Sequence, residues 1–333
     1  MYDFEEPRVR EFLQRTGARR AALQLPAGLA RYLPEILRPF DQLGVEPVVV
    51  AGSCYGACDL ADEAARKLGS DVLVHYGHAD MGLGSVMPTL YVEARIKKSP
   101  VDALELALPA LDFRRVGLVT TVQHIGHLEE VASFLNSHGM QTLVGEPSFR
   151  TRYPGQVLGC DVSCAKAVAP SVDGFIYIGT GDFHPLGVAF ATGKKVVSVN
   201  PVSRGFKVFM PRQEKFIKGR KAKVAQAALG KTFGVIVSTK KGQARFSLAR
   251  KIVGLLSKEG KQACLLAVDD VSPESIENFC FDALVCVACP RIPIDDGERF
   301  ERPVLTPFEI LAMLGKVPME PYQMDEINKE DMG

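Results

Sequence analysis

Short apolar runs alternate along the chain with segments whose apolar residues recur every three or four positions. The runs are typical of strands buried on both faces, and the spaced segments are typical of amphipathic helices. One order of elements occurs three times: an opening strand, a helix that ends at a glycine, a second strand, a connection and a strand that begins with Asp. The pattern predicts an α/β protein of three repeated units, each with a parallel sheet covered by helices.

The repeat is defined by elements that correspond in order. The predicted opening strands cover residues 21–25, 116–120 and 233–237, and the Asp-led strands cover 71–80, 173–182 and 282–291. The expected helices cover 31–43, 126–138 and 245–259, end at Gly44, Gly139 and Gly260, and precede second strands over 45–50, 140–144 and 261–268. In the first unit a further helix is expected over 59–68. The repeat predicts units of 1–110, 111–225 and 226–333.

Three of the eight cysteines hold related places in these units. Cys58 and Cys160 are each followed by Asp and stand thirteen residues before the Asp that opens the third strand. Cys289 ends the Asp-led strand of the third unit. The loops at the carboxyl ends of parallel strands build the sites of α/β sheets, and all three cysteines are expected there. Units arranged about a pseudo-threefold axis would bring the three thiols to a common centre.

One thiol per unit suits an iron–sulfur cluster at that centre. A [4Fe–4S] cluster held by three thiolates keeps one iron open to a substrate, whereas four thiolates are typical of an electron carrier. Cys54 and Cys164 have no counterparts in the other units, which favours Cys58, Cys160 and Cys289 as ligands. A zinc site built from close cysteine pairs is the alternative, as is a fourth cluster ligand from Cys54 or Cys164.

The composition is that of a folded protein with a sizeable core: 47% of the 333 residues are hydrophobic and 24% are charged. A net charge of +1 gives no electrostatic case for nucleic acid or a membrane surface. No apolar run reaches the roughly 18 residues of a membrane helix. Residues 1–7 are not typical of a signal peptide, so we expect a cytoplasmic protein with reduced thiols. Cys264, Cys280 and Cys286 are expected to be small buried apolar residues.

Three motifs surround the candidate ligands, at residues 55–62, 155–160 and 288–292. They resemble the three cysteine motifs of the archaeal diphthamide synthase family. The resemblance extends over nearly the whole chain and includes residues 24–28 and 75–80. Quinolinate synthase, another three-unit enzyme with one cysteine per unit, is a more distant resemblance.

The resemblance to diphthamide synthase implies a radical enzyme of the first diphthamide step. It implies a [4Fe–4S] cluster, S-adenosylmethionine as cosubstrate and an external electron donor. Cleavage between the sulfonium and the methionine γ-carbon would give methylthioadenosine and a 3-amino-3-carboxypropyl radical, which adds to the imidazole C2 of a histidine in translation elongation factor 2. The family is also expected to form homodimers. Quinolinate synthesis and a non-catalytic metal-binding adaptor are the alternative functions.

Loop residues near the predicted centre are candidates for binding the methionine part of the cosubstrate. They are Pro26, Ala27, Gly28, Gly77, His78, Gly179, Thr180 and Arg291. The alternative for each is a turn residue or a surface charge, and His78 also fits a neutral core histidine. No protein base is needed for the cleavage, so no side chain is assigned a catalytic role.

Two further segments carry predictions about the surface. Residues 204–223 hold eight Lys or Arg against one Glu, which predicts either a solvated face or a docking surface for an acidic protein partner. The apolar run 86–92 predicts either an inner strand of its own sheet or an exposed edge that a second copy of the chain covers.

Overall fold

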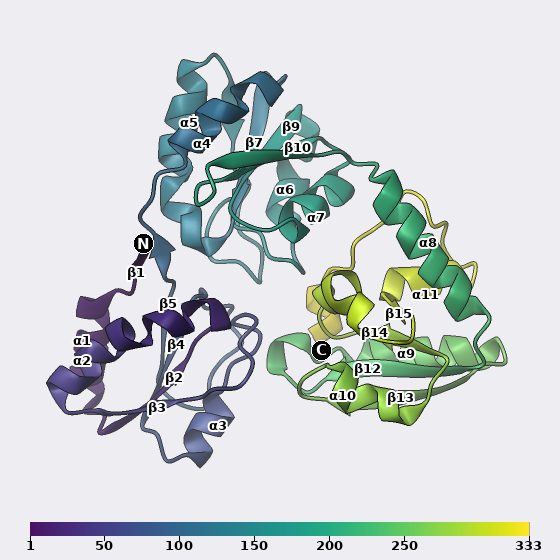
Figure 1. Cartoon of the computed structure of the whole chain (residues 1–333), viewed down its shortest axis with the longest axis horizontal. Coiled ribbons are helices and arrows are strands. Elements are labelled where there is room, and N and C mark those ends of the chain that lie inside the picture. Colours follow the sequence, from purple (N-terminus) through teal and green to yellow (C-terminus); the bar gives the residue numbers. More distant parts are fainter. Residues whose placement is uncertain (333) are drawn as a thin grey trace.

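The computed structural model describes residues 1–332 and shows three α/β units placed like the corners of a triangle (Figure 1). The first sheet has the strand order β3-β2-β4-β5, and all its neighbours are parallel. Its strands are β2 (Arg20–Gln24), β3 (Glu46–Val49), β4 (Val72–Tyr76) and β5 (Thr89–Val92). A separate antiparallel pair joins β1 (Tyr2–Asp3) to β6 (Arg95–Ile96).

The other two sheets repeat this arrangement. The second has the order β11-β10-β9-β7-β8, with only β11 antiparallel to its neighbour, and the third has the order β13-β12-β14-β15. The strands of the second are β7 (Arg115–Thr120), β8 (Gln141–Leu143), β9 (Gly174–Ile178), β10 (Val196–Asn200) and β11 (Gly205–Phe209). Those of the third are β12 (Thr232–Ser238), β13 (Gln262–Val268), β14 (Ala283–Cys286) and β15 (Val304–Leu305). Each opening strand lies between its second strand and its Asp-led strand, which confirms the predicted fold class.

The helices that follow the opening strands end where the sequence predicts. Gly44, Gly139 and Gly260 have φ of 65°, 79° and 72°, a left-handed conformation that glycine adopts without steric cost. The larger helices are α1 (Glu6–Thr16), α2 (Leu33–Leu43), α5 (Leu128–Ser137), α7 (Phe183–Thr192), α8 (Glu214–Ala228) and α9 (Phe246–Lys258). The shorter ones are α3 (Asp62–Lys67), α4 (Val101–Ala107), α6 (Ser163–Val168), α10 (Pro273–Ile276) and α11 (Pro307–Met313).

The Asp that opens each third strand ties that strand to the start of the opening strand. The Asp71 carboxylate accepts hydrogen bonds from the backbone N–H groups of Arg19 and Arg20, at 2.8 and 2.9 Å. Asp173 accepts the equivalent pair from residues 114 and 115, and Asp282 accepts the pair from residues 231 and 232. These backbone hydrogen bonds lower the pKa of all three carboxyl groups. The repeated Asp therefore has a structural role: it joins the amino ends of two neighbouring strands, whereas the cysteines lie beyond the carboxyl ends.

We expect the hydrogen bonds of these three Asp carboxylates to make the stability of the folded chain depend on pH. A carboxyl group whose pKa is lower in the folded than in the unfolded chain stabilises the folded chain at pH values above its unfolded-state pKa of about 3.9. This contribution is lost as the pH falls through the folded-state pKa. Replacing Asp71, Asp173 and Asp282 together by Asn should lower the urea midpoint at neutral pH, and the difference from the unaltered chain should shrink below about pH 4. The exposed Asp41 serves as the control, and Asp41→Asn should leave the pH profile unchanged. An equal loss at all pH values would contradict the electrostatic origin of the effect.

The three units have separate hydrophobic cores. Helix α4 contributes Ala103, Leu104 and Ala107 to the core of the second sheet, and helix α8 contributes Ala227 to that of the third. The boundaries near residues 110 and 225 stay a prediction. Helices α4 and α8 connect one unit to the next. Their position in the sequence alone does not show which of the two adjacent sheets their apolar residues pack against.

The predicted burial of three cysteines holds for one of them. Cys286 lies in the core of the third unit, whereas Cys264 and Cys280 are exposed. Cys264 lies on β13, which is the outer strand of its sheet and has exposed residues on both faces, with Leu266 its one buried residue. Cys280 occupies a surface turn with a φ of 53°. An apolar sequence around a cysteine does not reveal whether both faces of its strand are covered.

The apolar run over residues 86–92 forms β5, which pairs with β4 at the outside of the first sheet. Leu90 and Val92 point into the core of their own unit. The prediction of a strand in its own sheet is therefore confirmed, but that strand lies at the edge and not inside the sheet. No helix within residues 1–332 is both long and apolar enough to span a membrane.

Candidate metal centre

Cys58, Cys160 and Cys289 lie in loops that follow β3, β8 and β14, at the carboxyl ends of the three sheets. Their thiols come close enough to influence one another. Burial raises the pKa of Cys289, and the Cys58 and Cys160 thiols raise it further. Burial also raises the pKa of Cys160 to about 11, against the opposing charge of Arg150. One thiol from each unit therefore lies in the same neighbourhood, and all three are partly exposed. That they bind a common metal centre stays a prediction.

A loop of the third unit closes over Cys58. The backbone N–H of Gly242 donates to the Cys58 carbonyl at 3.1 Å, and Nε2 of Gln243 donates to Cys58 Sγ at 3.3 Å. A side chain at position 242 would place its Cβ 2.4 Å from the Cβ of Cys58, so only glycine fits there. The Gln243 side chain of the third unit thus donates a hydrogen bond directly to Cys58, a candidate ligand of the first unit.

Arg150 of the second unit completes this junction. Its side chain is 2% exposed, and Nη2 donates to the carbonyl of Gly242 at 3.0 Å. Burial raises the pKa of both Cys160 and Cys58, and the charge of Arg150 opposes this rise at each thiol. Arg150 and Gln243 thus place hydrogen-bond donors beside the thiols of Cys160 and Cys58. Neither residue was identified from the sequence.

Two lysines fix the segment that carries Cys58. Lys240 Nζ lies 2.8 Å from Asp59 Oδ1 and 2.6 Å from Asp270 Oδ1, and Lys241 Nζ lies 2.7 Å from Asp62 Oδ2. Burial raises the pKa of Asp59 in spite of the neighbouring ammonium group. The ion pairs with Asp59 and Asp62 cross from the third unit to the first and hold the Cys58 loop in place, whereas the pair with Asp270 lies within the third unit.

The C-terminal residues hold the Cys160 loop in the same way. The backbone N–H of Ile327 donates to the Cys160 carbonyl at 2.9 Å, and the Glu326 carboxylate accepts from the N–H of Val162. Arg245 of the third unit lies 2.6 Å from Asp325 in a buried ion pair. The tail therefore links the third unit to the second beside a candidate ligand.

The other cysteines near the ligands make different contacts. Cys164 donates to the carbonyl of Gln156 at 3.2 Å inside the core of the second unit. Cys286 contacts the carbonyl of Cys289 at 3.8 Å and lies in the core of the third unit. Cys54 lies in a separate group with two histidines of the first unit.

The predicted cosubstrate residues of the first unit lie together. Pro26 packs on Gly77, where an added Cβ would lie 2.9 Å from the proline ring. Ala27 and Gly28 are exposed at the start of the 3₁₀ segment Ala27–Tyr32, where backbone N–H groups are free of helical partners. Burial lowers the pKa of His78 to about 4, so its ring is neutral at physiological pH.

A second group of these residues comes from the other two units. Arg291 stacks on Phe183 with its guanidinium 5.3 Å from the ring centroid, and its Nε donates to Asp295 at 2.8 Å. The carbonyl of Thr180 accepts from the Tyr177 hydroxyl at 3.3 Å, and Gly179 has a φ of 154°. Arg291 thus borders the Cys160 side of the centre, although its guanidinium already has a carboxylate partner.

The donor set fits an iron–sulfur cluster better than three free thiols. Burial is the main cause of the raised pKa values of Cys160 and Cys289, and neighbouring thiols raise them further, so three free thiolates would be disfavoured here. Bound iron stabilises thiolates, and hydrogen bonds to cluster sulfurs tune its potential. Arg150 and Gln243 are placed to supply such bonds. The arrangement can therefore bind an iron–sulfur cluster through three cysteines from three units.

Comparison with known proteins agrees with this geometry. Residues 25–323 match the family model described as putative diphthamide synthesis protein. The 2-(3-amino-3-carboxypropyl)histidine synthase of Pyrococcus horikoshii is 41% identical over 329 residues, which cover 98% of this chain and 94% of that protein. Subunit 1 of the Gallus gallus enzyme is 29% identical over 100% of this chain and 82% of its own length. The crystal structure of Dph2 from Pyrococcus horikoshii with a 4Fe-4S cluster superposes with a TM-score of 0.91 over 98% of this chain and 95% of that chain. The chain belongs to the diphthamide synthesis family.

Proposed function

We propose that this chain transfers the 3-amino-3-carboxypropyl group of S-adenosylmethionine to the imidazole C2 of a histidine in translation elongation factor 2, the first step of diphthamide synthesis. The observation that carries the proposal is the meeting of Cys58, Cys160 and Cys289, one from each unit. The names of relatives over the full length support the same activity, 2-(3-amino-3-carboxypropyl)histidine synthesis.

The residues of the centre divide into two roles. Cys58, Cys160 and Cys289 would hold a [4Fe–4S] cluster, which when bound supplies one electron to the sulfonium and an open iron for the methionine part of the cosubstrate. Gln243 and Arg150 would orient the thiolates through the contacts described above. For the methionine carboxylate and amine we propose backbone and side-chain groups of the two flanking sets: Pro26, Ala27, Gly28, Gly77, His78, Gly179, Thr180 and Arg291.

The test is an anaerobic incubation with dithionite, S-adenosylmethionine and elongation factor 2. We expect methylthioadenosine in solution and a mass gain of one aminocarboxypropyl group on a histidine of the factor. Formation of 5′-deoxyadenosine as the main product would contradict the proposed direction of cleavage. Quinolinate formation from iminoaspartate and dihydroxyacetone phosphate would favour the quinolinate synthase alternative. Partner binding without turnover of S-adenosylmethionine would favour the adaptor.

Gln243 offers a second prediction within this function. Its amide donates to Cys58 Sγ, and a hydrogen bond to a cluster sulfur stabilises the reduced, more negative state. Gln243→Leu should therefore shift the reduction potential of the cluster to more negative values while the iron content stays the same. Redox titration followed by electron paramagnetic resonance measures this. Gln226→Leu on the exposed face of α8 is the control, and an unchanged potential in Gln243→Leu would rule out the role.

The partners follow from the same proposal. We propose a cytoplasmic homodimer that receives electrons from an external donor, and light scattering should give a mass near twice 36.3 kDa. A monomer at micromolar concentration would contradict the dimer. The basic segment 204–223 is a weak docking surface, because five of its eight cations form ion pairs within the chain: Arg204, Lys207, Arg220, Lys221 and Lys223.

A further inference from the structure

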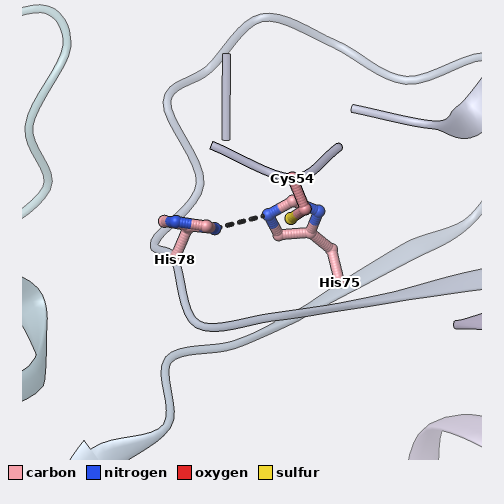
Figure 2. Close-up of side chains that lie close together, drawn as sticks. All are labelled: Cys54, His75 and His78. Atoms are coloured by element: carbon pink, nitrogen blue, oxygen red, sulfur yellow. Dashed lines mark hydrogen bonds between the residues drawn. The ribbon is translucent and has the colours of Figure 1, made fainter. Parts of the chain in front are cut away.

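A second group of metal-binding side chains lies in the first unit, outside the three cluster cysteines. Sγ of Cys54 and one ring nitrogen each of His75 and His78 all lie within 4.8 Å of one another. Figure 2 shows the two rings joined by a hydrogen bond, with the Cys54 sulfur overlapping the His75 ring in this view. Cys54 comes from the loop after β3, His75 from the end of β4, and His78 from the loop that follows. Three separate segments of the first unit therefore each place one possible metal-binding atom in the same small volume.

A chain of hydrogen bonds fixes which nitrogen of His75 faces this point. Oε1 of Gln24 accepts the backbone N–H of Ala61 at 2.9 Å and lies 2.8 Å from Nδ1 of His75. The amide oxygen can only accept, so Nδ1 of His75 carries the proton and donates it. Nε2 of His75 therefore presents a lone pair, and it lies 2.9 Å from Nδ1 of His78. A ring held at its far nitrogen by an acceptor is the usual arrangement of a metal-ligating histidine.

We propose that Cys54, His75 and His78 bind one Zn²⁺ ion and leave its fourth position to water. One thiolate and two imidazoles form a donor set that suits zinc, and three protein ligands are typical of a site with an open position. Zinc–nitrogen bonds of about 2.0–2.1 Å in a tetrahedral site place the two nitrogens about 3.3 Å apart. The two nitrogens therefore need to separate by a few tenths of an ångström, and both rings need to turn so that their lone pairs point to the metal.

Binding replaces the proton that the two rings share. Nδ1 of His78 gives up its proton and bonds the metal, while Nε2 of the same ring takes a proton. Cys54 loses its thiol proton to solvent and binds as thiolate. No oxidant or reductant is involved, and the Zn²⁺ comes from solution. In this state Nε2–H of His78 becomes a donor, which is compatible with a contact to the cosubstrate.

Two alternatives to a zinc site lead to different metal contents. The histidines can be a simple buried hydrogen-bonded pair, with Cys54 nearby by chance of packing. Alternatively, Cys54 can serve the iron–sulfur cluster, because it stands four residues before Cys58. A simple histidine pair predicts no zinc, whereas a cluster ligand at position 54 predicts that iron and not zinc depends on Cys54.

The test measures iron and zinc together. The full-length chain is purified anaerobically with its cluster, equilibrated with a zinc buffer at micromolar free metal, and analysed by mass spectrometry of the elements. We expect one zinc in addition to about four irons per chain. Zinc-edge X-ray absorption should show one sulfur at about 2.3 Å and nitrogen or oxygen neighbours at about 2.0–2.1 Å. A zinc shell of three or four sulfurs would place the metal at the cluster cysteines and overturn the proposal.

Matched variants separate the two metals. Cys54→Ala should reduce zinc at least tenfold and leave iron unchanged, and His78→Gln should do the same. Cys164→Ala is the control, because Cys164 is a second extra thiol beside a cluster ligand and should affect neither metal. Absence of zinc from the unaltered chain, retention of zinc by Cys54→Ala, or loss of iron from Cys54→Ala would each overturn the proposal. These readouts do not depend on turnover, so they remain valid if the proposed transferase activity is wrong.

Discussion

Replacement of Cys58, Cys160 or Cys289 by alanine should each abolish the iron–sulfur cluster and the release of methylthioadenosine. Each variant leaves two thiols for a cluster proposed to need three, one from each unit, and the Cys58 and Cys160 thiols lie near enough to raise the pKa of Cys289. The anaerobically purified chain should contain about four irons, and the variants should contain far fewer. Iron analysis and visible absorbance measure the first effect, and chromatography of the nucleoside product measures the second.

The neighbouring thiols provide controls of the same chemistry. Cys164→Ala and Cys54→Ala should retain the full iron content, because Cys164 is engaged with the Gln156 carbonyl and Cys54 lies beside His75 and His78. A Cys58→Ala chain that keeps four irons would show that Cys54 or another donor takes its place. That result would refute the ligand set derived from the repeat.

Loss of Arg220 should destabilise the third unit by about 3–5 kcal/mol. This arginine lies in the basic segment, but its side chain is buried against Glu309, with Nε and Nη2 both 2.6 Å from the carboxylate oxygens. Its remaining donors bond the carbonyls of Pro293 and Val304. The Tyr322 hydroxyl also donates to Glu309, at 2.8 Å. Arg220→Met would leave a carboxylate buried without its countercharge, and this is the main source of the loss.

Urea unfolding measures this effect, and two further variants define its cause. Lys218→Ala lies on the exposed face of the same helix and should change the free energy of unfolding by no more than about 0.5 kcal/mol. The double variant Arg220→Met, Glu309→Leu removes both charges and should recover much of the stability. If Arg220→Met behaves like Lys218→Ala, the buried network contributes little.

The fold was predictable because the same order of elements is written three times. Local signals set each unit: apolar strands, helices that end at Gly44, Gly139 or Gly260, and the Asp before the third strand. Their agreement across units compensates for the weakness of each signal alone. The role of the Asp residues was not predictable, because it depends on hydrogen bonds to strands about fifty residues away.

The site was predictable only where the repeat marks it. The assignment of Cys58 and Cys160 as ligands follows from correspondence between units, and that of Cys289 from its place at the end of the Asp-led strand. Arg150 and Gln243 have no such counterpart, and their contacts join residues 92 and 185 positions apart. Nothing in the sequence near either residue indicates these neighbours, since the packing of one unit on another decides them.

The basic segment shows a different limit. A run of charges predicts a solvated face, yet Arg220 within it is the buried partner of Glu309. Arg220 is buried because its position on α8 faces α11, which carries Glu309. A count of charges along the sequence does not contain this information.

The separation of the three proposed cluster ligands along the chain has a consequence for durability. A cluster that joins residues about a hundred positions apart acts as a crosslink, and closing loops of that length restricts the unfolded chain as long-range disulfides do. Each sheet has its own core and is not crosslinked internally. Exposure to oxygen should therefore loosen the junctions between units first, through the contacts of Gly242, Arg150 and the tail, while the sheets stay folded. Oxidative damage would then appear as greater protease sensitivity of the loops between units before any loss of secondary structure.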